Sequence, residues 1–166
     1  MALLTPKDVQ EALVRKGLTV RIQTFQVPTA TAQQAADALG TPLGTIVKSL
    51  CFLVDQTPVL VLTAGDKLVD DRKLAALFGT SRKKVKIADP ETTIRVTGYA
   101  PGGVAPVGHR ESIAIYVDAN LGRFETVYAA AGSANTIFPI PLSTLIEITE
   151  GRLVDVTKDQ QSSAAD

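Results

Sequence analysis

Two almost uninterrupted apolar segments constrain the fold of this chain more than any other feature. Residues 48–54 and 59–63 are rich in Leu, Val and Phe, and Asp55-Gln56-Thr57-Pro58 lies between them. Apolar runs of this length, bounded by turn residues, indicate β-strands, and the short connection favours antiparallel pairing. Strands without polar alternation are covered on both faces of a sheet. The sequence therefore predicts a central hairpin with both faces buried.

Helix and strand signals surround this hairpin. Thr5-Pro6-Lys7-Asp8 supplies an N-cap, a proline at the first helical position and an early acid, and Gly17 ends that helix. We expect further helices over residues 31–39, after Asp70 or Asp71, over 90–97 and from Pro141, and further strands over 20–25, 112–118, 126–130, 137–140 and 153–156. This order predicts an α+β fold with a mixed, largely antiparallel sheet flanked by helices.

The chain shows no internal repeat and no linker. We therefore expect a single domain over residues 1–158, followed by a polar, disordered tail over 159–166. The oligomeric state is left open by the sequence.

Composition excludes several classes of function. Lys plus Arg and Asp plus Glu both number 17, so no global field attracts a polyanion and any such site must be a local patch. A single Cys and a single His argue against a disulfide, a cysteine zinc cluster and a two-histidine metal site. No apolar run reaches membrane-spanning length, and the first residues are too short for a signal peptide. We expect a cytoplasmic protein with no membrane partner, no metal and no cofactor.

The segment 97–109, TGYAPGGVAPVGH, contains four glycines and two prolines between two apolar segments. Such a run cannot form the interior of a helix or a strand. Gly102 and Gly103 allow the backbone to approach a ligand with its amides exposed, while Pro101 and Pro106 stiffen the flanks. A rigid loop of amides suits an oxyanion, a carbonyl or a phosphate, and a tight turn between strands is the alternative interpretation.

Lys48 stands at the head of the first apolar segment, where its ammonium must meet water or an anion. The nearby sequence 40–49, GTPLGTIVKS, fails the spacing of a phosphate-binding P-loop because three residues separate the second glycine from Lys48. Cys51 is expected as a small buried hydrophobe, and His109 as a structural hydrogen-bonding group. A cysteine hydrolase that uses Cys51 and His109 is a distant alternative.

The only dense basic run is SRKKVK, residues 81–86. Such a run is usually a solvated surface. If the ligand is a nucleic acid, Arg82, Lys83 and Lys84 are the expected phosphate contacts, because clustered cations release condensed counterions.

An ordered set of short motifs resembles the YbaK/ProX family, the freestanding aminoacyl-tRNA editing domains related to the insertion domain of bacterial prolyl-tRNA synthetase. The set covers roughly residues 20 to 150, and any one motif alone is weak. The motifs are Thr31-Ala32, Ala35-Ala36, Leu39-Gly40, Ile46-Val47-Lys48-Ser49-Leu50, Ala64-Gly65-Asp66, Ala88-Asp89-Pro90, Thr97-Gly98-Tyr99, Gly102-Gly103-Val104-Ala105-Pro106 and Ala131-Gly132.

This resemblance implies a trans-acting hydrolase for the ester between a wrong amino acid and the 3′-terminal adenosine of a tRNA. It implies that Lys48, Gly102 and Gly103 are the catalytic groups, with Lys48 binding a phosphate or ribose oxygen or holding the end of the strand. It also implies tRNA as a partner, prolyl-tRNA synthetase as a second one, and no metal. The substrate-binding residues that it implies are Phe25, Ser49, Val104, Ala130, Ala131 and Gly132.

The chain departs from the family pattern at three positions. Ala105 replaces a hydroxyl residue, and Cys-specific members tend to carry Ser at Ala130 and Asp at Ile137. These differences make the pocket more apolar. We therefore expect a small apolar substrate such as alanine or 2-aminobutyrate on prolyl tRNA. A second hypothesis, from a different class, is a non-catalytic protein that binds an aminoacyl nucleotide or regulates a synthetase.

Overall fold

The computed structural model of the chain describes residues 2–159, and the expected tail over 160–166 lies outside the described part. Asp159, assigned to that tail, accepts a hydrogen bond from the Lys73 ammonium at 2.8 Å. The five α-helices within the described residues are α1 (Pro6–Arg15), α2 (Ala32–Leu39), α3 (Asp71–Leu77), α4 (Pro90–Thr97) and α5 (Leu142–Thr149). Three short 3-10 helices are η1 (Leu43–Thr45), η2 (Arg82–Lys84) and η3 (Ala119–Arg123).

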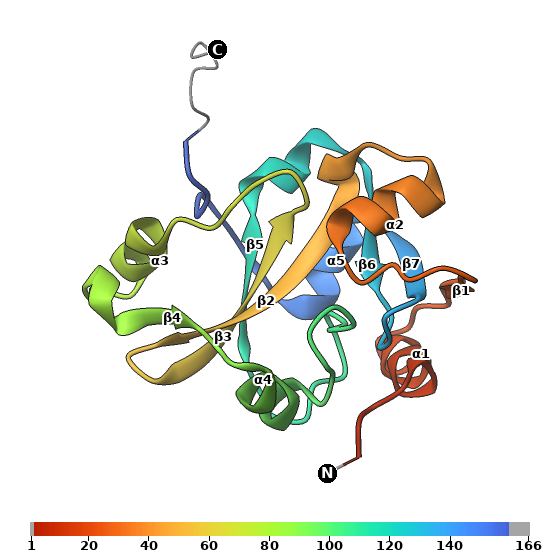
Figure 1. Ribbon diagram of the computed structural model, residues 1–166, viewed down its shortest axis with the longest axis horizontal. Coiled ribbons are helices and arrows are strands. Elements are labelled where there is room, and N and C mark those ends of the chain that lie inside the picture. Colours follow the sequence, from red (N-terminus) through yellow and green to blue (C-terminus); the bar gives the residue numbers. More distant parts are fainter. Residues whose placement is uncertain (1, 160–166) are drawn as a thin grey trace.

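The described residues form one mixed sheet, whose strand order is β1-β7-β6-β2-β3-β5-β8, with β4 added to β2 (Figure 1). The strands are β1 (Gln23–Thr24), β2 (Ile46–Val54), β3 (Thr57–Ala64), β4 (Val85–Ile87), β5 (Ala114–Asp118), β6 (Thr126–Ala130), β7 (Thr136–Pro141) and β8 (Arg152–Val154). Four of the strand pairings are antiparallel, and three are parallel: β2 with β6, β3 with β5, and β5 with β8. The α+β single-domain prediction is confirmed.

The predicted central hairpin is β2 and β3, which pair antiparallel from Val47 with Ala64 to Val54 with Thr57. Its turn is tighter than expected, because only Asp55 and Gln56 lie outside the strands. Both residues have positive φ, 49° and 69°, which is the backbone of a type I′ hairpin turn.

Both faces of the hairpin are buried, as its composition predicts. Cys51, Leu60 and Leu62 belong to a core that includes side chains of α1 and α5. Phe52, Val59 and Val61 belong to a second core that includes side chains of α3. α2 covers a third, smaller cluster around Ile46 and Ile137. Successive strand side chains point to opposite faces, so continuous apolar sequence supplies both cores.

The edge of β2 that faces away from β3 positions the candidate site. β6 pairs with this edge only at Ile46 and Val47, and β4 pairs with it only at residues 52–54. Among the described residues, no strand pairs with residues 48–51 on that side. The sheet therefore opens in its middle, beside α2 and the glycine-rich loop (Figure 1).

Three expected strands are shorter than the sequence pattern indicates, including the one expected over 112–118, which begins at Ala114. Residues 20–25 alternate like a strand, but only Gln23 and Thr24 pair, because β1 meets only residues 136 and 137 of β7. The last strand covers residues 152–154 rather than 153–156. Lys48 is also not the first strand residue, since Ile46 and Val47 pair with β6 ahead of it.

Candidate functional site

A cavity of about 260 Å³ lies where the sheet opens. Its walls come from the segment before α2, from α2 itself, from β2, from the glycine-rich loop, and from β6 and β7. Lys48, Ser49, Gly102, Val104 and Ala130 line it together. Five of the residues implied by the family resemblance, far apart in sequence, therefore share one cavity.

Ser49 lines this cavity. Its Oγ atom is buried and has no hydrogen-bond partner among the described residues. A buried hydroxyl without a partner costs stability. The carbonyl of Ile46 accepts from the Gly65 amide beside β3, while the carbonyl of Cys51 accepts from Ala88 on the other side. Since the direction alternates along an antiparallel strand, the peptide groups of Ser49 point toward the open edge.

Lys48 lines the cavity, and its ammonium is held by the turn after β3. Its Nζ atom donates a hydrogen bond to the carbonyl oxygen of Lys67 at 2.7 Å. Burial lowers the pKa of Lys48 below its usual value, and the carboxylates of Asp66 and Asp118 oppose that shift. An ammonium carries three N–H donors, so two remain for a ligand after the bond to Lys67. The cation thus finds a carbonyl rather than bulk water.

The acids near Lys48 are occupied by other partners. The guanidinium of Arg123 donates to both oxygens of Asp66, at 2.7 and 2.9 Å, which lowers the pKa of that carboxyl. Asp118 is fully buried and accepts from the amides of Ala64 and Asn120 at 3.0 and 2.8 Å. These bonds fix the turn after β3 to which Lys48 is attached. Neither acid lines the cavity, so neither is placed as a general base there.

The glycine-rich loop contains a tight turn as well as a cavity wall. The Gly103 amide donates to the Ala100 carbonyl at 3.0 Å, and Gly102 has φ of +90°. Pro101 before a glycine of positive φ is the pattern of a type II turn. The expectation that the Gly103 amide is exposed for a ligand is therefore wrong, because the turn uses it. The amides of Gly102 and Val104 donate no hydrogen bond within the described residues, and both residues line the cavity.

Two side chains, the fully buried Tyr99 and the half-buried His109, brace this loop. The Tyr99 hydroxyl donates to the Val107 carbonyl at 2.9 Å. The His109 Nε2 atom lies 2.8 Å from the Ala105 carbonyl, and because a carbonyl only accepts, Nε2 carries the proton. Burial lowers the pKa of His109. His109 is therefore the structural hydrogen-bonding group that the sequence indicates, and it does not line the cavity.

Four of the implied site residues lie outside the cavity wall. Phe25 packs behind the wall, in the cluster with Ile46 and Ile137. Gly103 abuts the backbone of Ser133. Ala131 is fully buried in the core, and a Cβ on Gly132 would meet Val9 of α1 and the backbone of Thr5 and Pro6. The wall expected at Ala131 and Gly132 is formed one residue earlier, by Ala130.

Several residues of the cavity wall were not predicted as site residues from the sequence. They come from the segment before α2, from α2 and from β6: Thr29, Thr31, Ala35 and Tyr128. The small residues of α2 indicate close packing against the sheet, and this was the one sequence feature that pointed to α2 as part of the wall. Tyr128 packs against the cluster that contains Ala35 and Ala36 of α2. This contact depends on the order of the strands in the sheet, which the sequence does not reveal.

Cys51 does not act beside His109. Its side chain is buried in the core, and burial raises its pKa to about 11. Among residues 2–159, no group of three or more His, Cys, Asp or Glu side chains could hold a metal ion. No helix of the described part is long and apolar enough to cross a membrane.

The basic run forms η2 and the start of β4. Arg82, Lys83, Lys84 and Lys86 are all exposed, and none forms an ion pair within residues 2–159. Lys83, Lys84 and Lys86 line a second hollow of about 240 Å³ with Asp55 and Gln56.

Comparison with known proteins gives consistent results. The family profile of the aminoacyl-tRNA editing domain matches residues 26–148. The uncharacterised protein YwhH of Bacillus subtilis is 34% identical over 140 residues, covering 83% of this chain and 87% of YwhH. Proline–tRNA ligase of Staphylococcus aureus strain MRSA252 is 37% identical over 105 residues, which are 62% of this chain and 18% of the ligase. A crystal structure of a candidate trans-editing enzyme for prolyl tRNA synthetase has a TM-score of 0.86 at 32% identity, covering 93% of this chain and 97% of that one.

Proposed function

The chain belongs to the aminoacyl-tRNA editing domain family, and from that premise we propose that it is a trans-acting deacylase of mischarged tRNA. The reaction is hydrolysis of the ester between an amino acid and the 3′-terminal adenosine. Water adds to the carbonyl carbon, the bond from that carbon to the ribose oxygen breaks, and the ribose hydroxyl recovers a proton. The products are a free amino acid and an uncharged tRNA.

One observation carries this proposal: Lys48, Ser49, Gly102 and Val104 line one cavity of the described part, and the amides of Gly102 and Val104 donate no hydrogen bond within residues 2–159. An aminoacyl ester is already activated, so its hydrolysis needs positioning and stabilisation of the developing oxyanion more than a strong nucleophile. We assign oxyanion stabilisation to the amides of Gly102 and Val104. Gly103 keeps an indirect role, because its amide closes the turn that presents them.

Lys48 and Ser49 hold the substrate in this proposal. The two remaining N–H donors of the Lys48 ammonium bind a ribose or phosphate oxygen of the terminal adenosine. The Ser49 peptide groups, which point toward the open edge of β2, offer the substrate a second polar contact. Lys48 is not assigned as the general base, because this proposal uses its ammonium to hold the substrate.

The walls favour a small, apolar amino acid. Ala130 and Ile137, the positions at which the chain departs from Cys-specific members, both line the cavity. Ala35, Ile46 and Val104 add further apolar surface. A volume of about 260 Å³ must also admit part of the ribose, which leaves room for a short side chain. We therefore propose alanine or 2-aminobutyrate as the residue removed.

The relatives support prolyl tRNA as the substrate and prolyl-tRNA synthetase as a partner whose errors are corrected, and we expect this reaction in the cytoplasm. Arg82, Lys83 and Lys84 are proposed to contact phosphates of that tRNA, since they are exposed and without ion pairs in the described part of the chain.

The test is deacylation of prolyl tRNA charged with alanine, 2-aminobutyrate, cysteine or proline by the purified protein. Alanyl and 2-aminobutyryl tRNA are expected to be hydrolysed fastest, and prolyl-charged tRNA to survive. A clear preference for cysteine over alanine contradicts the proposed specificity. Tight binding of the RNAs without hydrolysis of any of them contradicts the deacylase and supports the non-catalytic hypothesis.

A further inference from the structure

The hollow between η2, β4 and the β2–β3 turn is strongly cationic. Lys83, Lys84 and Lys86 line it, and one carboxylate, Asp55, faces them. That carboxylate accepts a hydrogen bond from the Thr80 hydroxyl at 3.1 Å. The four cations of residues 82–86 stand out in a chain whose total charge is zero. A volume of about 240 Å³ is large enough to seat a phosphate group with its bridging oxygens.

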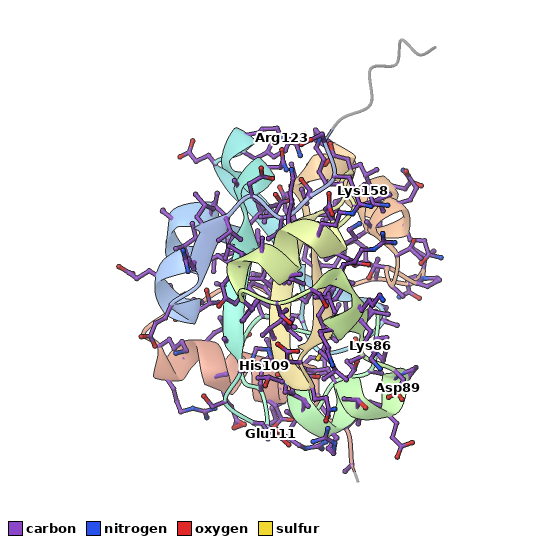
Figure 2. The ribbon with its side chains drawn as sticks, turned by 90° about the vertical axis from the view of Figure 1, so that its left-hand side faces the viewer. Lys86, Asp89, His109, Glu111, Arg123 and Lys158 are labelled. Atoms are coloured by element: carbon purple, nitrogen blue, oxygen red, sulfur yellow. The ribbon has the colours of Figure 1, made fainter. Side chains whose placement is uncertain are left out.

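This cationic hollow lies on the same edge of β2 as the cavity. The cavity occupies the unpaired part of that edge, and β4 pairs with the next part, with Lys86 opposite Leu53. Figure 2 shows Arg123, whose partner Asp66 adjoins the turn that holds Lys48, at the top of the molecule, and Lys86 below the middle on the right. A polymer that leaves the cavity along this edge therefore passes β4 and reaches the hollow.

The separation follows from strand geometry. Seven residues lead from Lys48 to Asp55 along β2, which at about 3.3 Å per residue is about 23 Å. At about 3.4 Å per nucleotide, the spacing along one strand of B-form DNA, this distance corresponds to about seven stacked nucleotides.

We propose that the hollow lined by Lys83, Lys84 and Lys86 binds the phosphate backbone of the tRNA acceptor stem about seven nucleotides from the 3′ end. The inference rests on the proposed function for the position of the 3′ end, and it adds a second, separate contact to the RNA. Because of this contact, the affinity of the protein for tRNA depends on the acceptor stem, whereas the cavity contacts only the 3′ terminus.

An RNA fits this surface better than an acidic protein segment does. The three lysines are joined in one concave site and are not paired with carboxylates among residues 2–159. Phosphates at regular spacing match several cations at once, and their binding releases counterions. The hollow also continues the strand edge that leads to the cavity, whereas a protein partner has no such reason to dock here.

The test uses direct binding, so that it does not depend on turnover. Fluorescence anisotropy with uncharged RNA hairpins that end in the tRNA 3′ terminus measures affinity for stems of increasing length. With the wild-type protein, affinity is expected to rise stepwise once the stem reaches about seven nucleotides from the 3′ end. In Lys83→Gln/Lys84→Gln the step is expected to vanish, and the slope of log affinity against log salt to fall by about 0.7 to 0.9 for each phosphate that the variant no longer neutralises.

A matched control removes the same charge elsewhere. Lys7→Gln/Lys16→Gln changes two exposed lysines at α1, which lies far from β4 in Figure 1. This variant is expected to keep both the step and the salt slope. An unchanged step in Lys83→Gln/Lys84→Gln, or an equal loss in the control, overturns the inference. If the wild-type protein shows the step in affinity but hydrolyses no mischarged tRNA, the docking site is supported and the proposed deacylase activity is contradicted. The failure of the docking site and the failure of the proposed function are therefore distinguishable.

Discussion

Gly103→Ala is the substitution whose effect the structure constrains most closely. An added Cβ would lie 2.9 Å from the carbonyl carbon of Ser133 and 3.0 Å from its Cα and N atoms. These are backbone atoms of the β6–β7 turn, so no side-chain rotation relieves the contact. Ordinary carbon contacts begin near 3.5 Å, and the two segments must therefore separate by about half an ångström.

The size of the effect follows from this separation. Overpacking of a tight contact costs about 1–3 kcal/mol, which for a chain of this length lowers Tm by about 3–10 °C. Because Gly103 closes the turn that carries Gly102 and Val104, the displacement also moves the proposed oxyanion donors. A misplacement of about 1 Å costs about a hundredfold in rate, so half of it predicts about a tenfold loss in kcat.

The assay combines thermal unfolding with single-turnover deacylation of alanyl-tRNA(Pro) at a temperature well below Tm. Gly122→Ala is the matched control, since nothing lies within 4 Å of its added Cβ, and both properties should stay near the wild-type values. A Gly103→Ala protein with lowered Tm and wild-type kcat would refute the assignment of the loop to the reaction.

Two further predictions concern buried titratable groups. Cys51→Ala is expected to cost about 1 kcal/mol of stability and to leave kcat unchanged, because burial raises the pKa of the thiol to about 11 and the side chain lies in the core; loss of turnover by a folded variant would revive the cysteine hydrolase. His109 has a pKa lower in the folded protein than its usual 6.5, so the unfolded chain binds more protons, and stability should be full above pH 6.5 and fall as the pH drops toward the folded pKa. Thermal unfolding of the wild type and of His109→Gln between about pH 7.5 and 5 checks this. The stability of His109→Gln is expected to depend less on pH, because the imidazole is absent. A steeper fall of stability in His109→Gln than in the wild type would contradict the prediction.

Local sequence signals predicted most of the fold. Thr31, Asp70 and Asp89 cap their helices with side-chain oxygens, and Gly40 and Gly98 end two of them in the left-handed region. The hairpin was predictable because its continuous apolar sequence is compatible only with burial on both faces. Strand ends were less predictable, since pairing length depends on the neighbour: β1 is short because β7 offers it only two residues.

The site was predictable as far as residue type reveals it. Lys48 is recognisable as a charged residue in an apolar segment, and Gly102 as part of a loop rich in glycine and proline. Both residues line the cavity. The role of Gly103 was not predictable from the two glycines, although Pro101-Gly102 is itself a turn signal that consumes the next amide. The wall ends at Ala130 because β6 ends there, and Ala131, the next residue, is fully buried in the core.

The central claim is that Lys48 and the free amides around one cavity hydrolyse an aminoacyl ester. Its most direct measurement is the deacylation rate of alanyl-tRNA(Pro) by the wild-type protein beside Lys48→Ala, with thermal unfolding of both. The account predicts hydrolysis well above the spontaneous rate by the wild type and, because the substrate is no longer held in position, a loss of about 10²-fold in a Lys48→Ala protein that is still folded. Equal rates for the two folded proteins would contradict it.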